Sequence, residues 1–321
     1  MSANPWRLRP ALTLPVLTLL ALLACVIFMT INARGNWGFV LPFRGTKLLA
    51  LVLIAYAIAV STVLFQTVTN NRILTPSIMG FDALYVLIQT ILVFIAGSSV
   101  GLLDPGVKFA LETLAMVTFA TALNLWLFSG RVRSLHLMVL VGIIFGVLFR
   151  SIANFLQRLI DPNAFVVLQD SMFASFNTFD RDLMGIAALT IIVSSLLGLK
   201  LLHTLDVLAL GRETAVNLGV AHRRTVMFIL MLVAVLVSVS TALVGPVTFF
   251  GLLVANLAYV LIGSHKHVFI LPAAILLAII SLVGGQVIVE QVFGLNTSLS
   301  IIIEFIGGLV FIFLILKGAT R

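Results

Sequence analysis

The sequence HTLDVLALGRETAVNLGVAHRR, residues His203–Arg224, is a polar stretch between two long apolar segments. Its central part, Arg212–Leu218, mixes charged and apolar residues in the way a short amphipathic helix does. Gly219 follows directly, and glycine is the residue that most often ends a helix. A connection with its own helix predicts a segment that docks into a partner. A plain surface loop between two helices is the alternative.

The composition of the chain points to a lipid environment. Of its 321 residues, 61% are hydrophobic and 9% are charged, too few to cover a water-soluble fold of this size. The formal net charge of +8 comes from Lys and Arg residues that stand singly or in pairs between apolar runs. This spacing fits the positive-inside rule of membrane proteins and argues against binding to nucleic acid. The one cysteine, Cys25, excludes an internal disulfide and a thiolate metal cluster.

Ten apolar segments are expected to cross the membrane as helices, because about 20 apolar residues span the hydrocarbon core. The third, eighth and ninth are short, which is tolerated where other helices shield a segment from lipid. The segments are roughly Ala11–Asn32, Lys47–Thr67, Asp82–Ala96, Val107–Phe128, Leu135–Leu156, Leu183–Leu202, Thr225–Leu243, Thr248–Ile262, Val268–Val283 and Ser298–Leu316. Residues 1–321 are therefore predicted to form a single all-α membrane domain.

The distribution of basic residues predicts the orientation of these helices. With the N-terminus in the cytoplasm, most of the 19 Lys and Arg residues lie on the cytoplasmic side. An even number of spans then places the C-terminus in the cytoplasm as well. In this topology the 203–224 segment connects the sixth and seventh spans on the cytoplasmic side, where a cytoplasmic partner can reach it.

Polar residues gather where the second span ends, in the sequence LFQTVTNNRILTPSIMGFDALY. Gln66, Asn70 and Asn71 lie at the exit of the span, and Pro76 and Gly80 interrupt any helix before the third span. A polar patch beside broken helices is typical of a pathway for a polar solute. An ordinary turn rich in Asn, Pro and Gly is the alternative.

The fifth predicted span carries Arg150 and Asn154, which share one helix face because they are four residues apart. An unpaired charge that faces lipid at this depth would cost at least about 3 kcal/mol. Arg150 is therefore expected to face protein, a partner or water. Two interpretations are open: a polar lining of the solute pathway, or a structural ion pair with Glu112 or Asp161.

The spacing Leu210-Gly211-x3-Ala215-x2-Leu218-Gly219 resembles the coupling-helix loop in permease subunits of type II ABC importers. That family carries ferric siderophores, haem and cobalamin, and its coupling loop enters a groove on the ATPase subunit. The resemblance implies that the following residues contact or shape the contact with the ATPase: Leu210, Gly211, Arg212, Glu213, Ala215, Leu218 and Gly219.

Two other stretches carry the same resemblance. Gln66, Asn71, Pro76 and Gly80 match the family pattern after the second span, with an arginine where the family has its first proline. The run GPVTFFGLL, residues 245–253, resembles the Gly-Pro-Ile-x-Phe-x-Gly-Leu signature at the start of the eighth span. The first stretch is most similar to the branch of the family that serves ferric catecholate and mixed-ligand siderophores.

The resemblance implies the type II ABC permease fold and a role as the transmembrane subunit of an ATP-driven importer of a ferric siderophore. The expected location is the bacterial cytoplasmic (inner) membrane, in contact with lipid. The expected partners are ATPase subunits, a second permease that is a sister subunit or an identical copy, and an extracytoplasmic substrate-binding protein. The chain has no Walker A motif, so ATP would bind to the partner ATPase and no cofactor to the chain itself.

These arguments assign two further groups of residues. The substrate pathway is predicted to include Gln66, Asn70, Asn71, Arg150 and Asn154. Docking of the binding protein is predicted for Arg44, Arg34 and Lys47, because these basic residues lie on the outer side, against the positive-inside bias. Snorkelling of the same side chains to the membrane interface is the alternative.

A proton-coupled secondary transporter with Glu304 or Glu290 as its proton site is the alternative function. No arrangement of catalytic side chains is apparent, so the chain is not expected to be an enzyme. His265 and His267 form a His-x-His pair in a short basic turn, a pattern more typical of plain surface than of a metal site. No metal site is predicted.

Overall fold

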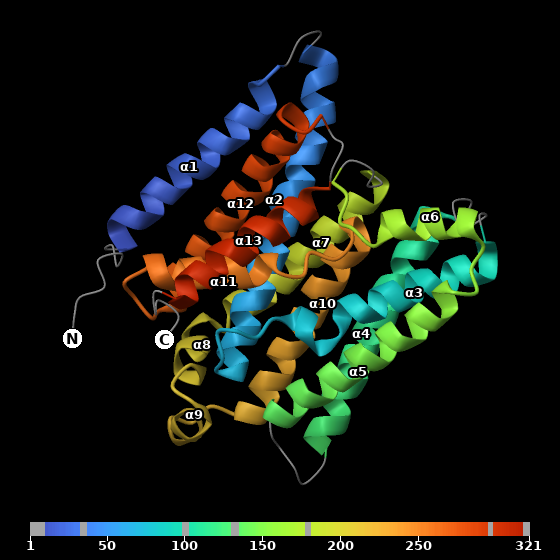
Figure 1. Cartoon of the computed structure of the whole chain (residues 1–321). Helices are drawn as coiled ribbons and strands as arrows, with labels where there is room; N and C mark the ends of the chain where they lie inside the picture. Colours follow the sequence, from blue (N-terminus) through green and yellow to red (C-terminus); the bar gives the residue numbers. More distant parts are fainter. Residues whose placement is uncertain are drawn as a thin grey trace.

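The computed structural model describes residues 10–32, 37–97, 103–129, 135–176, 181–294 and 298–316, and the regular elements in these ranges are helices (Figure 1). In chain order they are α1 (Pro10–Thr30), α2 (Trp37–Thr69), the 3-10 helix η1 (Pro76–Met79), α3 (Phe81–Ala96), α4 (Pro105–Ser129), α5 (Leu135–Gln157), α6 (Pro162–Ser171), α7 (Arg181–Leu199), α8 (Leu202–Leu208), α9 (Arg212–Asn217), α10 (His222–Val244), α11 (Phe250–Leu261), α12 (His267–Gln291) and α13 (Leu299–Leu316).

Seven of the described helices are long and apolar enough to cross a bilayer: α1, α2, α4, α5, α7, α10 and α12. Three shorter apolar helices, α3, α11 and α13, complete the set. Together they occupy the ten segments that the sequence predicts as spans. Lipid cannot hydrogen-bond to the backbone, so helices, which satisfy their own backbone groups, are the elements that this composition favours.

The ninth predicted span is longer than expected. The prediction ended it at Val283, whereas α12 continues through Gly284 and Gly285 to Gln291. A Cβ atom added to Gly285 would lie 2.7 Å from the Leu299 side chain. This glycine therefore makes room for the start of α13, and it does not end the helix.

Two other elements differ from the prediction. The second span was expected from Lys47, but α2 begins at Trp37 and continues through Pro42. The helix α6 was not predicted, although Asp161 and Pro162 carry a local signal for it. The Asp161 side chain accepts a hydrogen bond from the Asn163 N–H at 2.8 Å, and Pro162 occupies the first turn.

The core of the fold lies around α2 and α10, the two long spans that are mostly buried within the chain. The helix α2 packs against α12, α10 and α11, and α10 packs against α4, α2 and α7. The helix α1 contacts α12 and α2 and lies at the edge of the molecule (Figure 1). The functional segments described below are attached to this central pair.

A close backbone contact fixes the break between α2 and α3. Gly80, at φ +88°, lies between η1 and α3, and a Cβ atom added to it would be 3.0 Å from the Gly146 Cα. A Cβ atom added to Gly142 would be 2.9 Å from the Met79 Cα. Glycine is therefore needed on both sides, because any side chain would push η1 away from α5.

An ion pair joins α2 to α12. The Lys47 ammonium contacts the Glu290 carboxylate, and both side chains are mostly buried. Gln286 on the preceding turn of α12 also donates to the Glu290 Oε1, at 3.0 Å. Removing one member of a buried pair leaves the other charge without compensation, which costs more than the pair itself contributes.

We expect Lys47→Met to lower the free energy of unfolding by about 3 kcal/mol, because Glu290 would stay buried without its ammonium partner. The measurement is thermal unfolding of the purified protein in detergent. The double variant Lys47→Met/Glu290→Gln is the control and should melt closer to the wild type than the single variant does. A single variant that melts at the wild-type temperature would show that this ion pair does not stabilise the fold.

Candidate functional site

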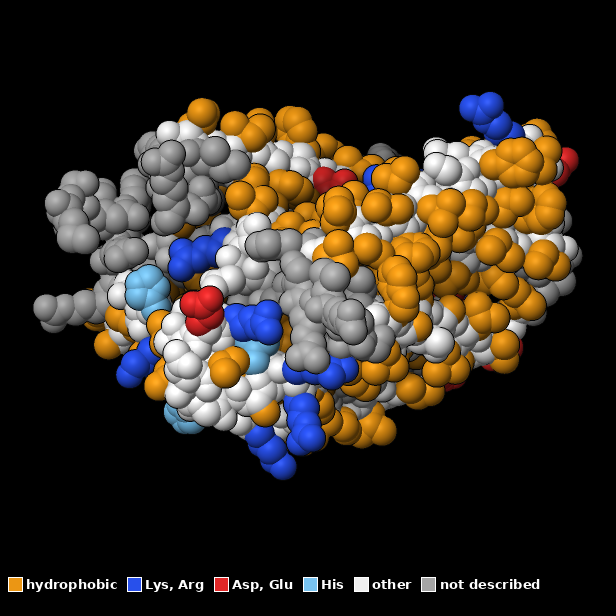
Figure 2. Space-filling model, turned by 90° about the horizontal axis from the view of Figure 1, so that it is seen from below, with side chains coloured by type: hydrophobic (Ala, Val, Ile, Leu, Met, Phe, Trp, Pro, Cys, Tyr) orange, Lys and Arg blue, Asp and Glu red, His pale blue; other side chains and the backbone are white. Residues whose placement is uncertain are grey.

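The helices α8 and α9 and the turn that follows them, residues 202–219, lie at one end of the molecule, and we call them the coupling segment (Figure 1). The helix α8 contacts α2, α12 and α9, and α9 contacts α10. This end of the molecule therefore also carries the C-terminal ends of α2 and α7 and the N-terminal ends of α10 and α12. Viewed onto this end, Lys and Arg side chains gather around the coupling segment (Figure 2). The coupling segment therefore lies at an end of the fold where basic side chains gather (Figure 2).

Local sequence signals explain how the coupling segment folds. Leu205 and Leu208 of α8 and Ala215 of α9 are buried, which attaches both short helices to the membrane helices. The Val220 N–H donates to the Ala215 carbonyl and the Gly219 N–H to the Val216 carbonyl, and Gly219 has a φ of +83°. This is the Schellman arrangement that glycine permits at a helix end. The predicted short helix that ends before Gly219 is confirmed, while α8 was not predicted.

The outer surface of the coupling segment is apolar at three positions. Leu210 is 61% exposed, Val216 is 52% exposed and Leu218 is 60% exposed, and we call these three residues the coupling patch. The charged residues Arg212 and Glu213 are exposed beside them. Large apolar side chains exposed on a polar surface indicate a contact with another protein. Of the predicted coupling residues, Ala215 is buried and attaches α9 to the fold, whereas Val216, which was not among them, is exposed.

The turn after α2 is held in place by side-chain amides. Gln66 is 2% exposed, and its Nε2 donates to the Arg72 carbonyl at 2.7 Å. The Asn256 Nδ2 donates to the same carbonyl at 3.0 Å, and the Arg72 guanidinium lies over the Tyr259 ring, 4.5 Å from its centroid. The Gln66 Oε1 is buried without a hydrogen-bond partner in the described part of the chain. Gln66 thus shapes this turn from inside.

Asn70 and Asn71, the other predicted pathway residues at this turn, take different positions. Asn71 Oδ1 accepts a hydrogen bond from the Ile73 N–H at 2.9 Å, which stabilises the turn. Asn70 has a φ of +51° and is exposed. A Cβ atom added to Gly211 would lie 3.7 Å from the Asn70 Nδ2, so the start of α9 lies beside the end of α2. The structure therefore brings one predicted pathway residue next to the coupling segment.

Arg150 and Asn154 are exposed on α5, in the half of that helix away from the coupling segment. The structure does not bring them together with the turn after α2. It also assigns other partners to the two acids considered for Arg150. The Glu112 carboxylate accepts from Gln89 at 2.6 Å and lies 3.9 Å from the Lys108 ammonium, whereas Asp161 caps α6. Neither acid forms an ion pair with Arg150 within the described ranges.

The residues predicted to dock a binding protein have contacts inside the chain. The Arg44 guanidinium donates to the carbonyls of Phe28 and Ile31, at 2.8 and 2.7 Å, and so caps the C-terminal end of α1. Lys47 belongs to the ion pair with Glu290. Arg34 lies outside the described residues. For Arg44 and Lys47 the structure thus provides a role in joining α1, α2 and α12, beside the predicted one.

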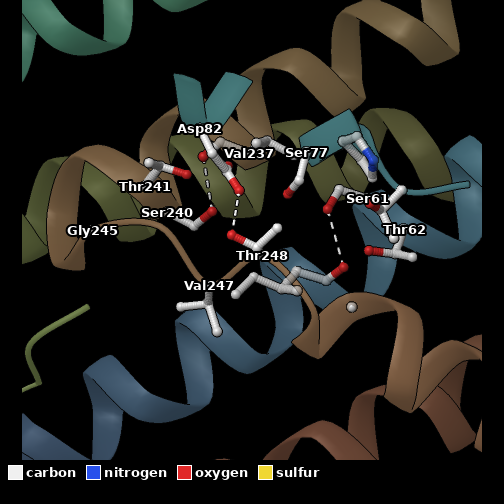
Figure 3. Close-up of a pocket in the computed structure, with 14 residues that line it drawn as sticks. Ser61, Thr62, Ser77, Asp82, Val237, Ser240, Thr241, Gly245, Val247 and Thr248 are labelled. Carbon is white, nitrogen blue, oxygen red and sulfur yellow. Dashed lines mark hydrogen bonds between the residues drawn. The ribbon is translucent and has the colours of Figure 1, made fainter. Parts of the chain in front are cut away.

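A small polar cavity lies at the break before α3, between α2, η1, α10 and the turn before α11 (Figure 3). Its volume is about 20 Å³, roughly the space that one water molecule needs. The buried Asp82 carboxylate accepts a hydrogen bond from the Thr248 hydroxyl at 2.7 Å. The other polar side chains that line the cavity are Ser61, Thr62, Thr75, Ser77, Ser240 and Thr241. Sequence reasoning missed this cluster because its members come from four separate segments.

The two histidines of the basic turn differ. His265 is exposed, as predicted for a surface pair, but His267 is 2% exposed and lies between α8 and α2. The prediction of plain surface was therefore wrong for His267, because residue 267 begins α12 and points inward. Among the residues that the structure describes, no group of three or more His, Cys, Asp or Glu side chains is placed to hold a metal ion.

Comparison with known proteins agrees with this arrangement. The family model described as the FecCD transport family matches residues 12–317. The chain is 46% identical over 296 residues to the petrobactin import system permease protein YclO of Bacillus subtilis (strain 168), covering 92% of this chain and 94% of the relative. It is 37% identical over 275 residues to the petrobactin import system permease protein FatC of Bacillus anthracis, covering 85% of this chain and 78% of the relative.

The more distant similarities concern the whole length of the chain. It is 26% identical over 335 residues to the ferric enterobactin transport system permease protein FepD of Escherichia coli (strain K12), covering 97% of this chain and 96% of that protein. A solved structure of a metal-chelate type ABC transporter in an inward-facing conformation superposes with a TM-score of 0.81 at 21% identity, over 96% of this chain and 99% of that chain. The predicted all-α permease fold is confirmed. The chain belongs to the FecCD transport family, as a membrane-spanning permease subunit of an ABC importer whose ATPase is a separate subunit.

Proposed function

We propose that this chain carries a ferric siderophore across the bacterial cytoplasmic membrane as one permease of an ATP-driven importer. Two relatives, at 46% and 37% identity, are named for petrobactin import, and a third is named for ferric enterobactin transport. The proposed cargo is therefore a ferric siderophore, with petrobactin as the first compound to test. A catecholate or mixed-ligand chelate remains the proposed chemical class.

The coupling patch is the observation that carries this proposal. Leu210 just before α9, Val216 within it and Leu218 just after it are exposed, whereas Leu205, Leu208 and Ala215 are buried. At the cytoplasmic end of a permease, a separate ATPase subunit fits this surface, and that ATPase would bind ATP. In this orientation the beginning of α1 and the end of α13 also lie on the cytoplasmic side.

The exposed position of Arg150 supports the proposal of a second permease subunit, with a pathway between the two subunits. It is exposed on a membrane helix of the single chain, and a charge that faces lipid there would cost at least about 3 kcal/mol. A second permease, identical or a sister subunit, can cover α5 and leave a water-filled pathway in which Arg150 and Asn154 face an anionic chelate. A guanidinium offers forked donors to chelate oxygens and keeps its charge.

A binding protein that delivers the chelate is proposed to dock at the opposite end, which carries α6 and the start of α2. Arg34, Arg44 and Lys47 stay its predicted contacts. The carbonyl and carboxylate partners of Arg44 and Lys47 also keep that end of α1, α2 and α12 in a fixed arrangement.

The energy source separates this function from proton-coupled transport. In proteoliposomes that hold the permease with a cognate ATPase and binding protein, uptake of radioiron-labelled petrobactin should require ATP and persist when an uncoupler removes the proton gradient. A Walker A Lys→Ala variant of the ATPase should abolish uptake. Uptake that stops with the uncoupler and survives the ATPase variant would contradict the proposal and favour a proton site such as Glu304.

Leu218→Asp should separate ATP hydrolysis from transport, because it places a charge in the contact with the ATPase. A desolvated, unpaired charge costs about 2–5 kcal/mol, so we expect uptake to fall at least about tenfold while the permease still inserts into the membrane. Uptake, ATP hydrolysis and binding of the ATPase are measured on the same preparation. Leu218→Met is the matched control, since it keeps an apolar side chain of similar size and should transport normally. Normal uptake by Leu218→Asp would remove Leu218 from the contact.

Arg150→Leu should lower uptake of an anionic chelate by about tenfold, because one charge-assisted set of hydrogen bonds to the cargo is lost. Assembly and basal ATP hydrolysis should be unchanged. Arg158→Leu is the matched control, an exposed arginine just after the end of the same helix. A variant that does not assemble would assign Arg150 a structural role, and normal uptake would exclude it from the pathway.

A further inference from the structure

The N-terminal end of α12 is fastened to the coupling segment by hydrogen bonds. His267, the first residue of α12, donates its backbone N–H to Asp206 Oδ1 at 2.8 Å. The His267 Nδ1 lies 2.6 Å from the same oxygen. Asp206 belongs to α8, so one carboxylate of the coupling segment holds both the backbone and the ring of His267. The negative charge also lies at the positive end of the α12 dipole, which strengthens the contact.

The other side of the His267 ring reaches α2. Its Nε2 lies 2.7 Å from the Thr67 Oγ1, and this hydroxyl lies 2.8 Å from the Val63 carbonyl. The hydroxyl has one proton and donates it to one acceptor at a time. When that acceptor is not the Nε2, a protonated Nε2 donates to the hydroxyl oxygen. In both cases the imidazole joins α8 to α2 through directional contacts at its two nitrogen atoms.

Thr67 lies two residues before the end of α2, beside the polar turn at residues 70–75. In that turn, the Arg72 carbonyl accepts hydrogen bonds from Gln66 of α2 and Asn256 of α11. The Arg72 guanidinium lies over the Tyr259 ring. These contacts attach the turn to α2 and α11. A displacement of α8 that acts on His267 therefore reaches the turn through α2.

We propose that His267 is a positioning residue for transport, which passes a displacement of the coupling segment to α2 and to the turn at residues 70–75. This proposal rests on the proposed function, in which the ATPase moves the coupling segment. The buried Leu205 and Leu208 also attach α8, but apolar contacts are non-directional and allow sliding. The Asp206–His267–Thr67 contacts fix both distance and orientation, so they carry the movement.

The test breaks each contact with a substitution that keeps the shape of the side chain. Thr67→Val removes the hydroxyl, and Asp206→Asn removes the charge. In proteoliposomes with the cognate ATPase and binding protein, each variant should lower the amount of radioiron-labelled petrobactin transported per ATP hydrolysed by about tenfold, the change that corresponds to one charge-assisted hydrogen bond. The double variant should transport as much per ATP hydrolysed as the more strongly impaired single variant, because both substitutions interrupt the same connection.

Thr69→Val is the matched control. Thr69 is buried on the same helix, and its hydroxyl bonds to the Phe65 carbonyl at 2.8 Å and to the Gln66 carbonyl at 3.3 Å, both within α2. This variant should keep the wild-type ratio of transport to ATP hydrolysis. Binding of the ATPase to all three single variants should equal that of the wild type, since the coupling patch is unchanged.

Three results would overturn the proposal in different ways. Wild-type ratios in both Thr67→Val and Asp206→Asn would show that His267 transmits nothing, while the proposed function would stand. A lower melting temperature with an unchanged ratio in the assembled complexes would leave these contacts a packing role alone. If the wild-type complex hydrolyses ATP but transports no ferric siderophore, the proposed function fails, and this proposal fails with it.

Discussion

Lipid offers no hydrogen bonds, and this constraint decides how each break in the membrane helices of this chain is built. After α2, the amides of Gln66 and Asn256 hold the carbonyl of Arg72. At the start of α3, the buried Asp82 accepts a hydrogen bond from Thr248 beside a cavity lined by hydroxyl groups. Both breaks lie against the central helices α2 and α10. Irregular backbone is thus placed where protein side chains, and not lipid, surround it.

The coupling segment combines a firm attachment with an uncovered outer face. Its inner leucines are buried, its C-terminal cap is closed by Gly219, and Asp206 bonds to the first residue of α12. Its outer leucines remain exposed. With such an attachment, a partner that binds the exposed side chains can displace the segment while the buried side chains keep it attached to the membrane helices.

Local signals made the spans and the short helix of the coupling segment predictable. Apolar runs, Gly219 and the spacing around Leu210 all act within a few residues. The partners of single charges could not be predicted, because they are distant in sequence. Glu290 is 243 residues from Lys47, and Asp206 is 61 residues from His267. A turn pattern describes His267 as surface, and only the packing of α8 and α2 around it buries the ring.

The contact between η1 and α5 is made by backbone against backbone, with Gly80 facing Gly146 and Met79 facing Gly142. Glycine at these positions lets the two segments approach more closely than larger side chains would allow. The start of α3, which carries Asp82, is thereby held close to α5. This closeness leaves the contact no tolerance, because a single added methyl group at Gly80 or Gly142 would push the two segments apart.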